Sequence, residues 1–270
     1  MPSSDLDNQK HHFDKSIYKD FGSMGFLGST IDGYGSSNSS KVSYGLIAAE
    51  FETIDSSYRS AISVQSSLVI HPIYYFGSEE QKNKYLPELI NGNSVGCFGL
   101  TESEAGSDPG SMKTNFTEEK DCFIINGTKN WITNAPIADI FIIWALDKKK
   151  NIKGFIIEKN TPGISTSLIK NKASLKISPT GQIILNNVKI PKNNILPNTQ
   201  GWKSVFSCLN TRRRVRPDLC PRAVPKRGRS SPPPSAGWPC PTQPLLHSGH
   251  GRAGGSGLTA PRSKLPPADR

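Results

Sequence analysis

Two stretches of the sequence combine an apolar segment with groups that bind planar or anionic ligands. The first is Phe-Gly-Leu-Thr-Glu at 98–102, which leads into Gly106, Ser107 and Asp108. The second is Trp-Ile-Thr at 131–133. A large flat ring beside hydroxyl donors suits a planar heteroaromatic ligand, and glycine with serine lets a backbone N–H and a hydroxyl approach a phosphate. Spacing alone leaves open the alternative that the tryptophan is a core residue.

The identities of these residues allow a more specific interpretation than their spacing does. The first stretch, followed by Gly-Thr-Lys-Asn-Trp-Ile-Thr-Asn at 127–134, resembles the flavin-binding segments of the acyl-CoA dehydrogenases, and the resemblance covers roughly residues 13–211. Within that family the chain looks most like the glutaryl-CoA dehydrogenases. The resemblance implies FAD as cofactor, with Trp131 over one face of the isoalloxazine, Thr133 near its reactive nitrogen and Ser107 beside both the flavin diphosphate and the pantetheine arm of an acyl-CoA. The implied cofactor-binding residues are Phe98, Leu100, Thr101, Gly106, Ser107, Trp131, Ile132 and Thr133.

Arg59 is the single arginine in residues 1–211, where every other cation is a lysine. A guanidinium grips a carboxylate through two parallel hydrogen bonds, which favours a carboxylate-binding role. The alternative is a surface ion pair with Glu52 or Asp55 on the same helical stretch. The surrounding Ser-Ser-Tyr-Arg-Ser-Ala resembles the glutaryl-CoA dehydrogenase segment that binds the distal carboxylate of the substrate. The resemblance therefore implies that Arg59 and Ser60 bind a dicarboxylic acyl thioester, glutaryl-CoA.

The reaction implied by the resemblance is α,β-dehydrogenation of an acyl-CoA. A glutamate takes the α-proton, the β-hydride passes to the flavin, and an electron-transfer flavoprotein reoxidises it; decarboxylation to a crotonyl thioester follows for a glutaryl substrate. In the glutaryl branch the base lies in a C-terminal helical bundle, whereas residues 212–270 contain no glutamate. Glu102 and Glu104 are interpreted as turn carboxylates. We therefore assign no catalytic residue, and expect the polypeptide as written to be inactive or nearly so and the family's homotetramer not to form.

The composition changes abruptly after Thr211. Residues 1–211 carry 21 basic and 20 acidic side chains, and residues 212–270 carry 12 basic and 2 acidic ones, so the tail supplies +10 of the net charge of +11. The tail has 12 Pro and 7 Gly but no Ile, Phe, Tyr or Met, and cannot bury enough apolar surface to offset its ordering. We predict disorder for 212–270 and interpret it as the product of a frameshift or a chimeric gene.

Hydrophobic periodicity predicts an α+β chain with four parts. A helical domain at 1–94 precedes an antiparallel β-domain at 95–200, a sandwich or barrel; the start of a truncated helix at 201–211 and the tail at 212–270 follow. The resemblance implies the same order, with the family's first helix or two shortened and its C-terminal bundle missing.

Individual elements follow from local patterns. Helices are predicted at 13–24, 41–53 and 58–75. The apolar face of the second is predicted to contain Val42, Leu46, Ala49 and residues 51–54. Ser78 to Gln81 has capping-box form and opens a short helix that stops near Pro87. Strands are predicted at 95–101, 112–117, 122–125, 139–146, 154–158 and 182–190.

Other classes of protein are less well supported. The five cysteines form no C-x-x-C pair and indicate neither a metal site nor a disulfide framework. The N-terminus lacks a secretory signal and no run is long enough to span a bilayer, which fits a bacterial cytoplasm or a mitochondrial matrix. The rival reading is a binding protein that uses the tail as a nucleic-acid arm or proline-rich ligand. Only Trp238 could stack on bases there, so no specific nucleic-acid partner is expected. Two nearer alternatives are a non-catalytic flavin or acyl-CoA binding fragment and a general short-chain acyl-CoA dehydrogenase.

Overall fold

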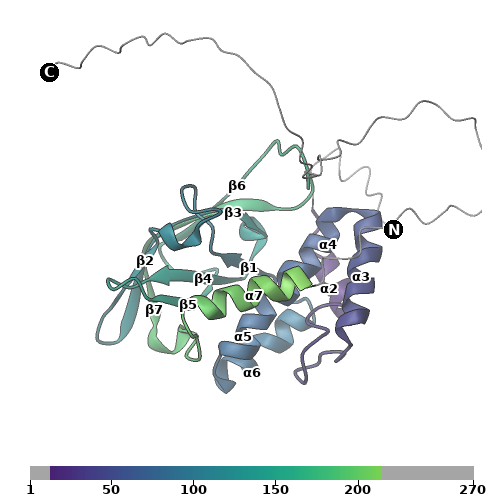
Figure 1. The fold of residues 1–270 in the computed structure, drawn as a ribbon, viewed down its shortest axis with the longest axis horizontal. Helices are drawn as coiled ribbons and strands as arrows, with labels where there is room; N and C mark the ends of the chain where they lie inside the picture. The colour runs from purple at the N-terminus through teal and green to yellow at the C-terminus, as the bar shows by residue number, and fades with distance from the viewer. Residues whose placement is uncertain (1–12, 215–270) are drawn as a thin grey trace, which may run out of the picture. The chain divides into compact units, whose positions relative to one another are not determined.

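The computed structural model describes residues 13–214, with the backbone alone for the last three. Helices gather on one side of a curled sheet, and the last helix packs against other helical elements (Figure 1). The predicted tail lies outside the described residues from 215 onward, while 212–214 belong to the last helix. The helices are α2 (Ile17–Ser23), α3 (Lys41–Ile54), α4 (Ser56–Ser63), α5 (His71–Phe76), α6 (Glu79–Ile90) and α7 (Trp202–Arg214).

The helix predicted over 58–75 is a continuous helical path with a change of pitch. Between α4 and α5 lies a π-helix, η1 (Val64–Ile70), in which every residue is buried. Asp55 separates α3 from α4 because its backbone is extended and its side chain accepts the N–H of Ser57. The predicted capping box of α6 is confirmed, but this helix continues past Pro87 to Ile90.

The apolar face predicted for α3 is wrong at Val42 and Leu46, whereas Phe51 packs against the core as predicted. Val42 and Leu46 are 72% and 57% exposed, and the buried residues are instead Tyr44, Gly45 and Ala48. Two of these buried residues, Gly45 and Ala48, are small, and α3 packs against α4. Counting apolar residues along one helix could not reveal this.

The sheet contains seven strands in a mixed arrangement. They are β1 (Gly96–Gly99), β2 (Asn115–Glu118), β3 (Cys122–Thr133), β4 (Ile140–Leu146), β5 (Ile152–Glu158), β6 (Ile164–Leu168) and β7 (Thr180–Pro191), in the order β1-β4-β2-β3-β7-β6 with β5 also paired to β4. The α+β class and the order of the domains are confirmed. The wholly antiparallel pairing is corrected, because β4 runs parallel to β1 and to β2.

Asp139 explains the parallel start of β4. Its backbone N–H donates to the carbonyl of Val95, and its carboxylate accepts the N–H of Val95 over 2.9 Å. The first residues of β1 and β4 are thereby held side by side, so both strands leave in the same direction. Lys15 joins the helical domain to this junction through an ion pair of 2.7 Å with Asp139.

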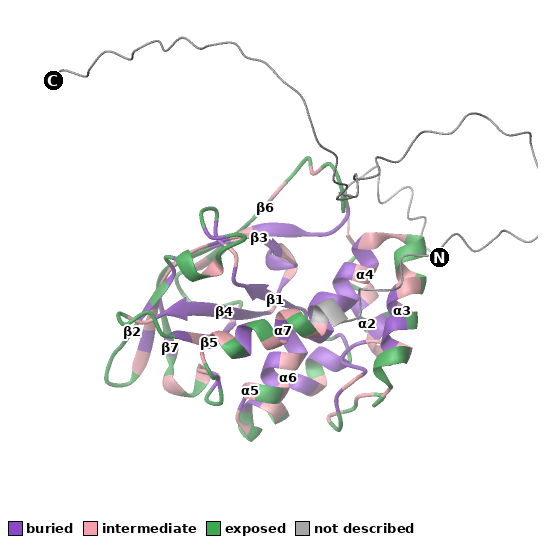
Figure 2. Cartoon of the chain, viewed as in Figure 1, coloured by how far each residue is buried: buried purple, intermediate pink, exposed green. Residues whose placement is uncertain are grey.

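Two buried clusters lie on opposite faces of β4. Ile140, Ile142 and Trp144 pack with the helices, whereas Phe141 and Ile143 pack inside the curl of the sheet. Burial on both faces accounts for the uninterrupted apolar run of this strand. Figure 2 shows the contrast between the buried strand and the partly exposed surface of α7. Within residues 13–214, no helix is long and apolar enough to cross a bilayer.

His71 is a packed residue with a clear expected pH effect. Its ring lies 4.4 Å from that of Tyr75, and its Nε2 is 3.4 Å from the Ser207 hydroxyl. Burial, with a smaller effect of Lys41, lowers the pKa of His71 from 6.5 to about 4. Because the unfolded chain takes up this proton first, the free energy of unfolding should fall as pH drops below 6.5, by about 2 kcal/mol at pH 5.

Urea unfolding at pH 7 and pH 5 checks this expectation. His71→Gln should lose about 2 kcal/mol less than the parent chain between the two pH values. The same pH dependence in both proteins would contradict it.

Candidate functional site

The two stretches predicted to form a site lie together. The backbone N–H of Asn130 donates to the carbonyl of Thr101 over 2.9 Å, and the Asn130 side chain donates to the hydroxyl of Ser103 over 3.0 Å. The end of β1 and the end of β3 are therefore joined directly. This contact is long-range and could be inferred beforehand only from the family resemblance.

Trp131 is turned out of the sheet by an irregularity in β3. The β3–β7 register shifts between Lys129 and Ile132, and Trp131 has a φ of 58°. A large side chain in the left-handed region is strained, and such strain is concentrated at functional sites. The ring is 59% exposed, which excludes the alternative that Trp131 is a core residue.

The other predicted cofactor residues divide into buried and accessible groups. Phe98, Leu100 and Ile132 are buried, so their side chains support the site rather than line it. Gly106 and Ser107 are exposed, and a Cβ added to Gly106 would meet no atom within 4 Å. Nothing inside the protein requires glycine at 106, and the open space beside it is available to a ligand.

A hollow of about 460 Å³ lies next to the exposed ring. Two lysines, several hydroxyls and an apolar wall line it, which suits a ligand with both flat and polar parts. Lys172 stabilises this wall because its ammonium donates to the Ser178 carbonyl and to the Thr180 hydroxyl. The lining residues are Trp131, Thr133, Lys170, Asn171, Lys172, Ala173, Ser174, Leu175 and Thr180.

A buried ion pair lies under the joined strand ends. Lys129 is fully buried, and its ammonium lies 2.9 Å from the Glu102 carboxylate and 3.0 Å from the Leu100 carbonyl. Burial lowers the pKa of Lys129 to about 8, partly opposed by Glu102. Burial acts to raise the pKa of Glu102, but Lys129 and the N–H donors outweigh it and the net shift is downward. Both groups are charged at neutral pH.

Sequence reasoning missed this pair. Glu104 is a turn carboxylate as interpreted, paired with Lys113 on the surface, but Glu102 is a buried structural group. The alternation of β3, in which Phe123 and Ile125 face inward, could have indicated that a later residue of the same strand is also buried. Lys129 keeps the phase of these two residues, because at the irregularity beside Gly127 the extra residue belongs to β7 and not to β3.

Arg59 lies on α4, where its guanidinium forms an ion pair with Glu52 at 2.5 Å. This is the ion pair with Glu52 that the sequence left open as an alternative. The guanidinium therefore already binds a carboxylate oxygen. Ser60 is buried but is the next residue along the helix, and so projects in a different direction. Ser63, also buried, is four residues after Arg59 and lies on the same helical face.

Gln65 connects the Arg59 helix with the first strand. Its side-chain N–H groups donate to the carbonyls of Leu89 and Ser94, and its oxygen accepts the N–H of Gly96 over 2.9 Å. A Cβ on Gly96 would lie 2.3 Å from a methyl group of Val69, so only glycine permits this approach of β1 to η1. The region that could bind an acyl group is thus rigidly attached to the strand that enters the candidate flavin site.

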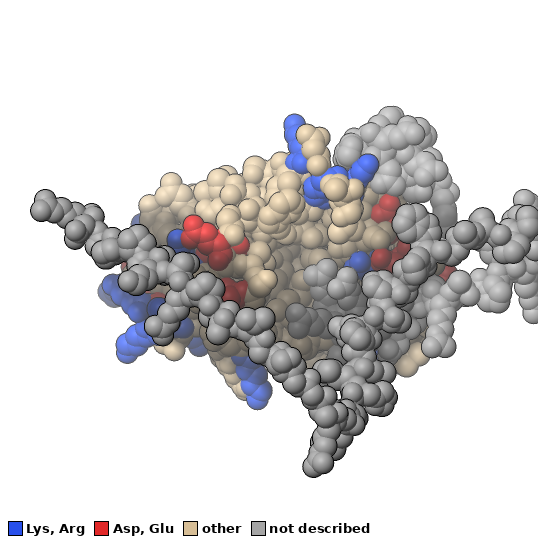
Figure 3. All heavy atoms as spheres, turned by 45° about the horizontal axis from the view of Figure 1, so that its top comes forward, with Lys and Arg blue, Asp and Glu red and all other residues tan. Residues whose placement is uncertain are grey.

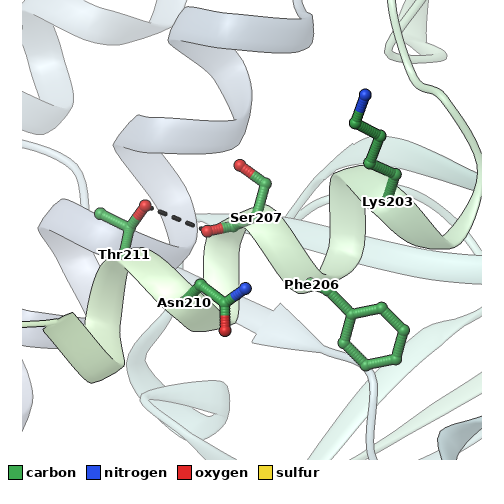
Figure 4. A pocket seen from close by; sticks show the side chains of 5 residues that line it. All are labelled: Lys203, Phe206, Ser207, Asn210 and Thr211. Atoms are coloured by element: carbon green, nitrogen blue, oxygen red, sulfur yellow. Dashed lines mark hydrogen bonds between the residues drawn. The ribbon is translucent and has the colours of Figure 1, made fainter.

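The remaining surface has less chemical character. Figure 3 shows one face, on which basic and acidic groups form small separate clusters. A second hollow follows α7 and is lined by Lys203, Phe206, Ser207, Asn210 and Thr211, with the Thr211 hydroxyl donating to the Ser207 carbonyl over 3.0 Å (Figure 4). One lysine and three small polar groups do not form a catalytic arrangement.

Comparison with known proteins shows the family to which the chain belongs. The family described as "Acyl-CoA dehydrogenase, N-terminal domain" matches residues 2–93, and "Acyl-CoA dehydrogenase, middle domain" matches residues 97–188. An acyl-CoA dehydrogenase of Bacillus subtilis (strain 168) is 36% identical over 200 residues, which are 72% of this chain and 53% of the relative. The chain belongs to the acyl-CoA dehydrogenase family, whose members are FAD-dependent oxidoreductases.

Two solved structures of glutaryl-CoA dehydrogenases are similar to this chain. A glutaryl-CoA dehydrogenase from Mycobacterium smegmatis in complex with FADH2 is 42% identical, with a TM-score of 0.76 over 77% of this chain and 54% of that one. A glutaryl-coenzyme A dehydrogenase in complex with glutaryl-CoA is 33% identical, with a TM-score of 0.76 over 79% of this chain and 56% of that one. The chain spans about half the length of the curated relatives it matches.

Proposed function

We propose that this chain carries the flavin-binding and acyl-binding surfaces of a glutaryl-CoA dehydrogenase-like enzyme. The observation that carries the proposal is the exposed, strained Trp131 at the point where the ends of β1 and β3 are joined. Backbone strain is concentrated at functional sites, and an exposed aromatic face beside hydroxyl donors can stack on a flat ligand.

The residues at the site fit FAD. Trp131 would cover one face of the isoalloxazine, and the Thr133 hydroxyl lies in the same hollow. The open space at Gly106 and the exposed Ser107 hydroxyl would accept the diphosphate. FAD, when bound, would accept a hydride from the β-carbon of the acyl group. The chain itself orients the ring and supplies hydrogen-bond donors.

We infer that the acyl group is dicarboxylic. Arg59 is held by a carboxylate in the structure, and a substrate carboxylate could replace or share the position of Glu52. Ser63 on the same helical face is a more suitable second donor than Ser60. The general short-chain alternative makes no use of a guanidinium, so the two readings differ in their dependence on Arg59.

We also propose that the polypeptide as written does not complete the reaction. The resemblance assigns the base to a helical bundle after α7, and the sequence there lacks glutamate. Proton removal from the α-carbon needs a base within hydrogen-bonding reach. An electron-transfer flavoprotein is the partner expected to reoxidise the flavin.

Reconstitution of the full chain with FAD tests the proposal. We expect protein-bound flavin after gel filtration, detected by absorbance, and no crotonyl-CoA above background when glutaryl-CoA and an electron acceptor are added. Steady formation of crotonyl-CoA would contradict the missing base. Absence of bound flavin at saturating FAD would contradict the flavin site, and the chain would then be at most an acyl-CoA binder.

A further inference from the structure

Lys129 and Glu102 connect three segments beneath the candidate flavin site. The Lys129 ammonium donates to the Leu100 carbonyl and to Glu102, and the same carboxylate accepts the backbone N–H groups of Lys113 and Thr114 over 2.7 and 3.0 Å. The end of β1, the approach to β2 and the end of β3 therefore share one buried ionic centre.

The burial of this pair calls for a reason other than stability. Removing two charges from water is costly, and a well-packed apolar pair of similar size is often equally stable or more so. Within residues 13–214, the other ion pairs all have partners with more exposed side chains than Lys129 and Glu102. What a buried pair provides, and an apolar pair does not, is directional hydrogen bonding.

These directional hydrogen bonds hold the two segments of the site together. Lys129 holds the carbonyl of Leu100, and the next residue of β3, Asn130, holds the carbonyl of Thr101 over 2.9 Å. Trp131 follows immediately in the strained conformation. The register between the first and second segments thus depends on consecutive contacts from residues 129 and 130.

We propose that Lys129 and Glu102 are positioning residues that set the register of the flavin-binding segments 98–102 and 131–133. They act through the backbone and do not themselves touch the cofactor. The expected effect on FAD binding rests on the proposed flavin-binding function. The expected effect on the backbone order of these two segments does not.

The test compares Lys129→Met, Glu102→Gln and the double variant with the parent full chain. Each single change should weaken FAD binding at least about 10-fold, because it leaves the other charge buried without its partner. In the double variant, FAD affinity should fall by no more than about 30-fold, because the two groups act as one unit. Independent effects would multiply to a loss of about 100-fold. Binding is measured by the quenching of FAD fluorescence.

Amide hydrogen exchange supplies a readout that a general loss of stability would not reproduce. In the apo chain, both single variants should exchange faster in peptides covering 98–103 and 127–133, with unchanged exchange in β4 and β5. Glu102→Gln changes no volume and guards against misfolding of Lys129→Met. Lys113→Met and Glu104→Gln, which break the exposed pair of the same loop, serve as matched controls and should change neither measurement.

The outcomes separate the two proposals. Equal acceleration of exchange throughout the chain, multiplicative loss in the double variant, or no change in either single variant would overturn the positioning role. If the parent chain binds no FAD, the flavin-binding proposal fails and exchange decides alone. Local acceleration would then support the register role, and unchanged exchange would refute it.

Discussion

Replacing Arg59 with alanine is expected to weaken the binding of glutaryl-CoA by about 100-fold and that of butyryl-CoA by less than about 2-fold. The guanidinium can give a carboxylate two charge-assisted hydrogen bonds, and butyryl-CoA has no distal carboxylate to receive them. Isothermal titration of the full chain reconstituted with FAD measures both affinities. Equal losses for the two thioesters would contradict the assignment of Arg59.

The neighbours of Arg59 provide matched controls. Glu52 forms an ion pair with the guanidinium in the structure and would compete with a substrate carboxylate. Glu52→Gln should therefore leave glutaryl-CoA binding unchanged or strengthen it a few-fold, which is a gain in binding free energy of about 1 kcal/mol. Ser63→Ala should weaken glutaryl-CoA binding more than Ser60→Ala does, because only Ser63 shares the helical face of Arg59. The reverse order would restore Ser60 as the second donor.

Replacing Trp131 with glycine is expected to move stability and cofactor binding in opposite directions. Glycine adopts a φ of 58° without strain, so the free energy of unfolding of the apo chain should rise by about 1 kcal/mol. Loss of the ring removes a large apolar face that would cover the isoalloxazine, and FAD affinity should fall about 100-fold. Urea unfolding and flavin fluorescence measure the two effects.

Two controls separate the ring from the backbone. Trp131→Phe keeps a flat ring in the strained conformation and should retain most of the FAD affinity. Leu168→Ala removes another exposed apolar side chain of the same sheet and should leave FAD binding as it is. A Trp131→Gly chain that binds FAD as tightly as the parent would exclude Trp131 from the cofactor site.

Local patterns were sufficient for most element types. The capping box of α6, the helical first half and the change to strands after Val95 follow from capping residues and hydrophobic period, which act over a few residues. The motif at 98–108 and the Trp-Ile-Thr motif identified a family because their residues are specific. Neighbours along the chain determine these properties, so the sequence alone was enough to predict them.

Features that depend on contacts between residues far apart in the sequence were decided only by tertiary packing. The sequence by itself determined the α+β order and the two motifs, but not the parallel start of β4 beside β1 or the inward face of α3. The outward turn of Trp131 and the burial of Lys129 against Glu102 were likewise decided by the folded chain. In each case the energy depends on which segments meet in space, because close backbone approach, register and desolvation are not encoded within a single local pattern.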